Sequence, residues 1–579
     1  MRISRPGPAI AVACLLTAGC ASVPPVPLRP EPVPYADTLP ISEPKERAPR
    51  EVWRLLRVSV GDEAAHPLSP RTLAGDRREA LNLTRFDDVV GSAWYVPRNR
   101  LEDPLDPSAV ERGPATIDGP SPEGPLAVVA GKSRGISPGF TIRDARGDLY
   151  LFKFDPKGYP NLGSGAGVIA NRVFHAAGYH VPEDYIVVFD PARLRLESEA
   201  TLEGEEYEER RMGPADIREI LSLTDSLPDG RYRALASRFV PGIPKGPFHF
   251  EGRRDDDPND HYEHQHRREL RGLYVVASWV NHIDARFANT LDAYVAPGYL
   301  RHHLIDFAAS LGSGTIRPHY PREGLEYNFD FWPSVARALT LGFYRRGWEG
   351  MEVEAIHPSI GWMRVESFDP GAWRPNWPNE AWRQMTPADT YWGAKLVAAI
   401  GDEQIRAAVA SGRLPAVAAD TLAEILIHRR DTTVAHWFAR VTPIERPAVV
   451  GAERAPGSVP DRALANGSGY GTIPLGFDDL GLALGLRSPE ETRYRWLFEH
   501  EALGRWSRGS APASGRGRQR LTIGFRDRSD VSGVSLARED SIATVEVTAH
   551  RPGSEGRRAV IYLRWAGPGL GYEVGGIRH

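Results

Sequence analysis

Two acidic residues and an asparagine, in one short region of the chain, have the types and spacing of a phosphoryl-transfer site. Asp284 and Asn289 lie five residues apart, directly after a strongly periodic helical segment, and Asp306 follows a predicted strand. One carboxylate can accept or orient the proton of a hydroxyl group, while a second carboxylate and an amide oxygen can ligate Mg²⁺. We therefore expect Asp284 to act on an acceptor hydroxyl, and Asn289 and Asp306 to bind metal.

A glycine-bearing loop and a lysine precede these residues in the chain. The loop carries Gly131, Gly135 and Gly139, and a predicted β-hairpin at residues 140–143 and 148–155 follows it. Lys153 lies on the second strand of that hairpin. Backbone N–H groups of a glycine loop can bind phosphate oxygens, and a lysine on the neighbouring strand can pair with the same phosphates.

In this order, these features resemble protein-kinase-like folds, and the atypical HipA-type branch more closely than the eukaryotic protein kinases. The resemblance covers roughly residues 126–440, with a hinge-like segment at 238–242. It implies that Lys153 contacts the phosphates of a nucleoside triphosphate and that Asp284 acts on the acceptor. It also implies that Asn289 and Asp306 hold Mg²⁺.

The helix after the lysine strand departs from the kinase pattern. Kinases carry a glutamate there that pairs with the lysine, whereas residues 165–171 contain no acid. Either Asp155 or a distant carboxylate substitutes, or the fold is retained and the activity is lost. The chain would then be a pseudokinase that binds a ligand or a partner.

The hydrophobic patterns predict an α+β protein, and the resemblance implies two lobes. We expect the N-terminal region and a β-rich N-lobe at 51–240, a helical C-lobe at 241–448 and a β-rich C-terminal domain at 449–579. Apolar residues at helical spacing predict a helix at 166–177, and 181–189 is a predicted strand. Residues 197–211 are highly charged and are expected to form an exposed insertion, whereas 544–548 and 559–565 are expected to pair as strands.

The first twenty residues have the features of a bacterial lipoprotein signal. Arg2 and Arg5 precede a short apolar run, and small residues precede Cys20, the expected lipidation site. An ordinary cleaved signal peptide at 1–19 is the alternative. Residues 20–50 are rich in proline and are expected to form an extended spacer. We therefore expect a membrane anchor at the periplasmic face of the outer membrane.

Composition excludes several other classes of function. Both cysteines lie in the signal segment, so cysteine-based zinc sites, disulfides and cysteine nucleophiles are not expected. The formal net charge of -4 gives no electrostatic basis for binding nucleic acid. The histidine cluster at 261–266 is interpreted as a solvated or ion-paired helix entry rather than a metal site. The fourteen tryptophans are interpreted mainly as core. An envelope hydrolase or carbohydrate-binding protein ranks last, because no pair of carboxylates can be placed.

Overall fold

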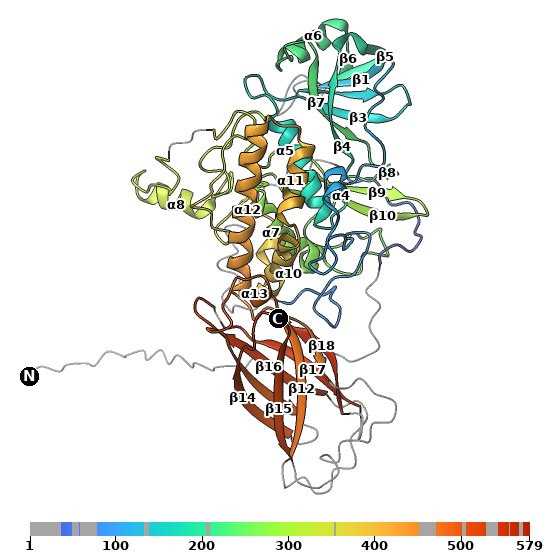
Figure 1. Ribbon diagram of the computed structural model, residues 1–579. Helices are drawn as coiled ribbons and strands as arrows, with labels where there is room; N and C mark the ends of the chain where they lie inside the picture. Colours follow the sequence, from blue (N-terminus) through green and yellow to red (C-terminus); the bar gives the residue numbers. More distant parts are fainter. Residues whose placement is uncertain are drawn as a thin grey trace, which may run out of the picture.

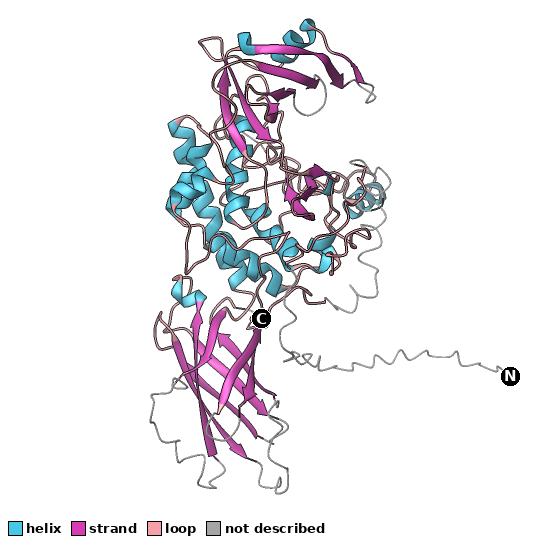
Figure 2. Ribbon diagram, turned by 90° about the vertical axis from the view of Figure 1, so that its right-hand side faces the viewer, coloured by secondary structure: helices cyan, strands magenta, loops and turns pink. Residues whose placement is uncertain are grey.

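The computed structural model describes residues 36–48, 57, 78–132, 138–203, 209–351, 355–450, 470–500, 505–527, 542–554, 556–566 and 571–579. Within these residues the chain is an α+β protein with three β-sheets and a body of helices (Figure 1). A β-sheet lies at each end of the molecule, and most of the helices lie between the two (Figure 2). The α+β class predicted from the sequence is therefore confirmed.

The N-terminal sheet contains seven strands: β1 (Leu126–Lys132), β2 (Gly139–Arg143), β3 (Leu149–Lys153), β4 (Asp184–Phe189), β5 (Leu194–Glu203), β6 (Glu209–Arg211) and β7 (Tyr232–Arg238). Their order in the sheet is β4-β7-β3-β2-β1-β5-β6. The β2–β3 hairpin forms as its alternating pattern predicts. Phe140, Tyr150 and Phe152 lie at the centre of the apolar core on one face of this sheet.

The described parts of the charged segment, 197–203 and 209–211, form strands and not an exposed insertion, so that prediction is wrong. Strand β5 pairs in parallel with β1, and β6 extends the sheet edge. Ala200 and Leu202 are buried among the apolar residues of the sheet. Because side chains alternate along a strand, the neighbouring Glu199 is exposed to water while Ala200 and Leu202 face the core.

The helical body is built from helices that are distant in sequence. Its main helices are α5 (Leu162–Ala176), α7 (Arg268–Trp279), α10 (Pro387–Ala398), α11 (Asp402–Ser411) and α12 (Ala416–Phe438), with α4 (Pro107–Arg112) and α9 (Glu380–Arg383) beside them. Helix α6 (Pro214–Ser222) packs on the N-terminal sheet, and α8 (Phe331–Leu339) lies at the edge of the body (Figure 1). A small sheet of β8 (Ile243–Pro244), β9 (Thr290–Val295) and β10 (Tyr299–Leu304) completes this part. Among the described residues, no helix has the length and apolarity needed to span a bilayer.

Helix α7 is buried along its whole length, and its first turn carries buried arginines. Arg268 and Arg271 both pair with Asp389 of α10, at 2.7 Å and 3.0 Å. His264, just before the helix, is buried and lies 2.7 Å from Asp260. Of the two interpretations of the histidine cluster, the ion-paired one is confirmed, and no group of metal-ligating side chains is found in the described ranges.

Four tryptophans pack inside this body, as the interpretation of the tryptophans as core predicts: Trp373, Trp382, Trp392 and Trp437. Trp377 lies outside this core and is partly exposed.

Residues 36–48, in the proline-rich stretch expected to be a spacer, are extended but lie against the helical body. The backbone N–H of Ile41 donates to the carbonyl of Gly298, and Arg267 pairs with Asp37 at 3.1 Å. Arg254 also donates to a backbone carbonyl in this segment, that of Lys45. These residues are therefore part of the packed structure. The signal segment, Cys20 and the proline-rich residues up to 35 lie outside the described residues.

The C-terminal sheet begins at Ile444, five residues before the predicted boundary, and short helix α13 (Leu480–Ala483) follows its second strand. Its strands are β11 (Ile444–Val449), β12 (Tyr470–Asp479), β13 (Arg493–His500), β14 (Arg505–Pro512), β15 (Gln519–Asp527), β16 (Ile542–His550), β17 (Ala559–Trp565) and β18 (Tyr572–Arg578). All of its pairings are antiparallel, including the predicted pairing of β16 with β17. Their inward residues form a separate apolar core.

Candidate functional site

The β9–β10 hairpin brings two of the predicted residues together. Thr290 pairs with Leu304, so the residues just before β9 and just after β10 lie at the same end of the hairpin. There the backbone N–H of Ile305 donates to the carbonyl of Asn289 at 3.0 Å. Local strand register therefore places Asp306 beside Asn289, although they are separated by a loop and two strands in the sequence.

Asn289 and Asp284 form a short polar turn. The side-chain amide of Asn289 donates to the backbone carbonyl of Asp284 at 2.8 Å and to its carboxylate at 2.9 Å. The amide oxygen of Asn289 accepts no hydrogen bond from any described residue. Because the Nδ2 group is used inside the turn, the oxygen is left as the group that could ligate a cation.

Asp284 is held by further partners that sequence reasoning did not identify. Arg286 lies 3.2 Å from its carboxylate, and Trp377 donates a side-chain hydrogen bond to it. The Arg286 guanidinium lies 5.6 Å from the centre of the Trp377 ring. Burial raises the pKa of Asp284 from its ordinary value of 3.8 to about 6, against the opposing effects of Arg286 and Asn289. Trp377 therefore belongs to this site and not to the core.

Lys153 and Asp306 form an ion pair across the junction of the N-terminal sheet and the helical body. The Lys153 Nζ lies 2.8 Å from Oδ1 of Asp306, whose side chain keeps 40% of its surface exposed. Burial raises the pKa of Asp306, but the ammonium of Lys153 outweighs this effect and holds the pKa below its usual range. The carboxylate is therefore ionised at neutral pH and remains reachable from solvent.

The helix without an acid, α5, packs on the sheet face that carries Lys153. A β-carbon added at Gly167 would contact Leu235 of β7 and lie 3.7 Å from Ala308, two residues after Asp306. Leu235 is the cross-strand partner of Lys153. Glycine in this helix thus permits a close approach between α5, the lysine strand and the segment of Asp306.

Asp155 does not substitute for the missing glutamate. Its carboxylate accepts hydrogen bonds from the backbone N–H and the hydroxyl of Ser164, both at 2.7 Å, and from the N–H of Asn161 at 3.1 Å. These contacts hold the first turn of α5, where backbone N–H groups lack partners within the helix. The suggestion that Asp155 replaces the glutamate is therefore not supported by its contacts.

A different buried acid, Asp184 of β4, lies close to Lys153. Asp184 pairs with Ser237 of β7, and Ser237 pairs in turn with Leu151 of β3, so all three side chains point to the face of Lys153. Asn171 of α5 donates to the Asp184 carboxylate at 3.2 Å.

Asp184 also interacts electrostatically with the Lys153–Asp306 ion pair. Burial raises its pKa to about 6; Ser237, Arg172 and Lys153 lower the value, and Asp306 raises it. An acid in the middle of the apolar stretch 181–189 is the sequence signal that could have drawn attention to it. We call Lys153, Asp184, Asp284, Asn289 and Asp306 the junction site.

The glycines of the predicted phosphate loop have different surroundings. Gly139 is the direct cross-strand partner of Lys153, and a β-carbon there would collide with the carbonyl oxygen of Phe152. A β-carbon at Gly131 would contact Met212 and Ile220, so glycine at this position allows these two side chains to pack closely against the sheet. Gly135 lies outside the described residues.

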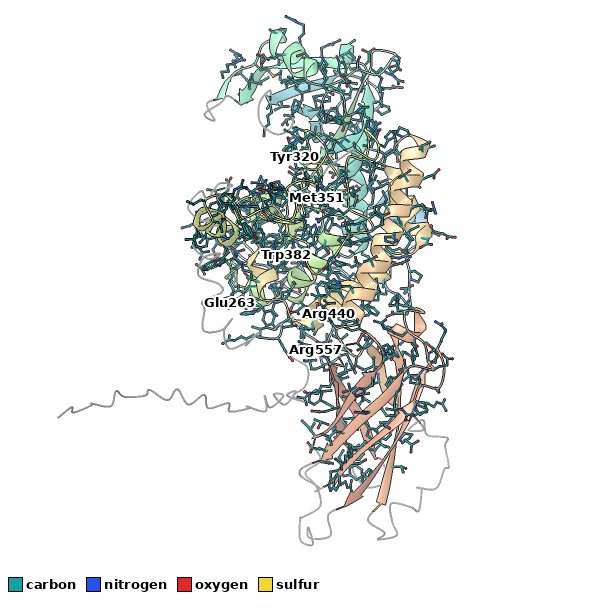
Figure 3. All side chains as sticks on the ribbon, turned by 90° about the vertical axis from the view of Figure 1, so that its left-hand side faces the viewer. Glu263, Tyr320, Met351, Trp382, Arg440 and Arg557 are labelled. Atoms are coloured by element: carbon teal, nitrogen blue, oxygen red, sulfur yellow. The ribbon has the colours of Figure 1, made fainter. Side chains whose placement is uncertain are left out.

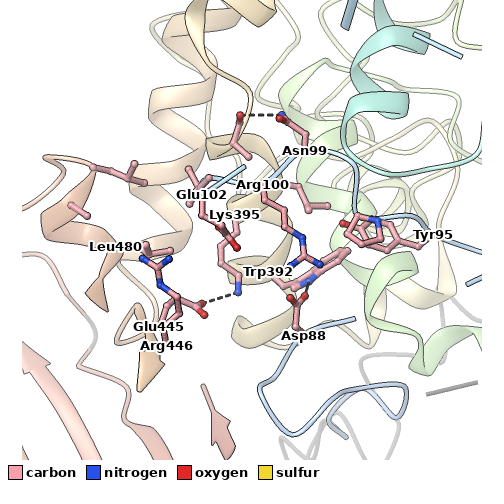
Figure 4. A pocket seen from close by; sticks show the side chains of 16 residues that line it. Asp88, Tyr95, Asn99, Arg100, Glu102, Trp392, Lys395, Glu445, Arg446 and Leu480 are labelled. Carbon is pink, nitrogen blue, oxygen red and sulfur yellow. Dashed lines mark hydrogen bonds and ion pairs between the residues drawn. The ribbon is translucent and has the colours of Figure 1, made fainter. Parts of the chain in front are cut away.

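A separate cavity of about 320 Å³ lies where the helical body meets the C-terminal sheet (Figure 4). Lys395 of α10 forms its polar wall with Glu445 of β11, 2.7 Å away, and the indole N–H of Trp392 donates to Asp88 at 2.8 Å. None of the residues of the junction site lines this cavity.

Comparison of this chain with family models, with curated proteins and with solved structures found no match.

Proposed function

We propose that this chain is a lipid-anchored envelope protein whose junction site binds a nucleoside triphosphate with Mg²⁺ and transfers phosphate on a two-lobed, protein-kinase-like fold. The observation that carries the proposal is the Lys153–Asp306 pair of 2.8 Å beside the Asp284–Asn289 turn. A lysine, two carboxylates and an amide oxygen, supplied by separate elements, are the groups that phosphoryl transfer requires.

The donors of the junction site fit the proposed cofactors. Asp306 offers an exposed, ionised carboxylate, and Asn289 offers an amide oxygen that accepts no hydrogen bond from the described residues. Oxygen ligands of this kind suit Mg²⁺, which commonly takes one or two protein ligands and completes its shell with phosphate and water. The metal would neutralise charge on the transferred phosphate.

The roles of the remaining residues follow from their contacts. Lys153 would exchange its pairing with Asp306 for a nucleotide phosphate, with Asp184 as the carboxylate left close to its ammonium group. Asp284 would accept the hydroxyl proton of the acceptor, because a pKa of about 6 leaves it ionised yet basic near neutral pH.

A thermal-shift measurement with ATP or GTP and Mg²⁺ tests this function. Ligand that binds only the folded protein raises its melting temperature, and we expect Asp306→Asn and Lys153→Met to abolish the rise. Lys157→Met is the matched control, because Lys157 is an exposed lysine four residues beyond the site. The proposal fails if no nucleotide shifts the melting temperature, or if the control behaves like Lys153→Met.

A pseudokinase is the second candidate, and two observations favour it. Helix α5 carries no acid, and the lysine and Asp306 neutralise each other in the structure. The proposed location outside the inner membrane also lacks a supply of ATP. A nucleotide-dependent thermal shift without phosphate transfer to any acceptor in a radiolabel assay would favour this second function.

A further inference from the structure

Large exposed apolar side chains are concentrated in one segment of the helical body. Of the nineteen large hydrophobic residues exposed among the described residues, ten lie between residues 316 and 356. The other nine are scattered along the rest of the chain. Single exposed apolar residues are normal, but a concentration of this kind marks an interaction surface.

Helix α8 and the turn after it form the outermost part of this surface. No residue of α8 is buried, and the helix projects from the edge of the body (Figure 1). Leu339, Leu341 and Phe343 expose 80%, 88% and 87% of their surfaces, and we name these three residues the apolar tip. Tyr320 and Met351, 53% and 37% exposed, belong to the same part of the chain (Figure 3).

The turn that carries the apolar tip is an ordered structure. Leu341 and Gly342 both have positive φ angles, of 51° and 90°, which reverse the chain after α8. The N–H of Gly342 donates to the carbonyl of Arg337 at 2.8 Å, and that of Phe343 to the carbonyl of Thr340 at 3.0 Å. The turn thus satisfies these backbone groups within the segment while its side chains face outward. A surface of this kind can enter an apolar medium without exposing free backbone donors.

The charge of the segment indicates what kind of surface it meets. Residues 331–348 contain three arginines and no acid, and Asp330 and Glu349 flank them directly. Arg337 and Arg346 pair with Glu349 and Glu326, at the base of α8. Arg345, beside the apolar tip, is exposed and has no hydrogen bond or ion pair with any described residue.

Aromatic side chains accompany these charges. Trp332 and Tyr344 expose 42% and 40% of their surfaces. Trp and Tyr favour the interface between lipid and water, where the ring is buried and its polar group stays hydrated. A helix with Trp, Phe and Leu on one side and arginine on the other lies in the plane of a bilayer surface.

We propose that α8 and the apolar tip form a membrane-contact surface that inserts into the interfacial layer of a bilayer containing anionic lipid headgroups. Leu341 and Phe343 enter the acyl boundary, and Arg345 pairs with headgroup phosphates. The contact adds a second attachment to the proposed lipid anchor, and it holds this face of the helical body against the bilayer surface. It does not depend on nucleotide binding at the junction site.

Vesicle co-sedimentation tests the proposal with the chain from Ala21 onward, which keeps every described residue and lacks the expected acylation site. We expect binding to vesicles of phosphatidylglycerol and phosphatidylethanolamine, and much weaker binding to phosphatidylcholine alone. The double variant Leu341→Ser, Phe343→Ser should weaken this binding by about tenfold or more. Arg345→Gln should weaken it less and reduce its dependence on salt.

Val417→Ser is the matched control, because Val417 is 73% exposed on a different element, α12. All variants change exposed side chains, and equal thermal unfolding curves would show that they fold. Absence of binding to anionic vesicles overturns the proposal, as does equal binding by the double variant and the control. A dimer, seen by light scattering and dissociated by the double variant, would instead assign the apolar tip to a contact between two copies.

Discussion

Replacing Asp284 with asparagine removes a charge that burial disfavours, so its effect on stability should depend on pH. The pKa of Asp284 is raised from 3.8 to about 6 in the folded protein. An acid whose pKa is higher in the folded state binds its proton more tightly there. Its contribution to the free energy of unfolding is therefore largest at low pH and is lost as the pH rises from about 4 to about 6.

The size of the effect follows from the shift of about two pKa units. Each unit corresponds to about 1.4 kcal/mol, which gives an upper limit of about 3 kcal/mol. Because the side chain keeps 21% of its surface exposed, solvent reduces this value, and we expect about 1–3 kcal/mol. At pH 4 the protonated acid resembles the amide, whereas at pH 8 only the wild type carries the disfavoured charge. Relative to wild type, Asp284→Asn should thus gain about 1–3 kcal/mol between pH 4 and pH 8.

Urea denaturation followed by tryptophan fluorescence at the two pH values measures this difference. Other titrating groups are common to both proteins and cancel in the comparison. Asp118→Asn is the control, since Asp118 is exposed to water. Two results would refute the reasoning: a stability difference that is the same at pH 4 and pH 8, or one that moves in the wild type's favour at pH 8. If Asp284 also accepts the substrate proton, the stabilised variant should lose its phosphotransfer activity.

Two further predictions concern the stability of α5 and of the C-terminal sheet. Asp155→Ala removes three hydrogen bonds from the first turn of α5 and should lower the free energy of unfolding by about 2 kcal/mol. The control Asp229→Ala, in an exposed turn, should leave the free energy of unfolding unchanged. Equal denaturation midpoints for the two variants would contradict the capping role of Asp155. In the C-terminal sheet, Arg551→Leu leaves the buried carboxylate of Asp479 without its 2.5 Å partner and should lower the free energy of unfolding by about 3–5 kcal/mol. Arg558→Leu breaks the more exposed pair with Glu546 and should lower it by less than about 1 kcal/mol. Differential scanning calorimetry measures both, and a similar loss for the two arginine variants would show that burial does not control the energy of these pairs.

Local pattern accounts for the features that were predicted from the residues alone. The alternation at 149–153 is enough to predict β3 and the face of Lys153, and helical spacing predicts α5. The pairing of β16 with β17 needs only a short turn between two alternating segments. Each of these features depends on residues close together in the chain. For such residues, the order of apolar and polar side chains determines which face of the helix or strand is buried.

Contacts between segments that are distant in the sequence could be identified only from the tertiary structure. The charges of strand β5 predict an exposed insertion, and only its parallel pairing with β1 shows that Ala200 and Leu202 are buried. Likewise, nothing local to Asp184 indicates that it faces Lys153. Two cross-strand registers and the packing of α5 bring it there.

The sequence by itself thus determined the types and order of the groups at the junction site: a lysine on a strand, then Asp284, Asn289 and Asp306. Only the fold decided that Lys153 pairs with Asp306, that Asp155 holds α5 instead, and that Asp184 lies near the lysine. The physical reason is that a side chain's partner is set by strand register and helix packing, which join residues far apart in the chain.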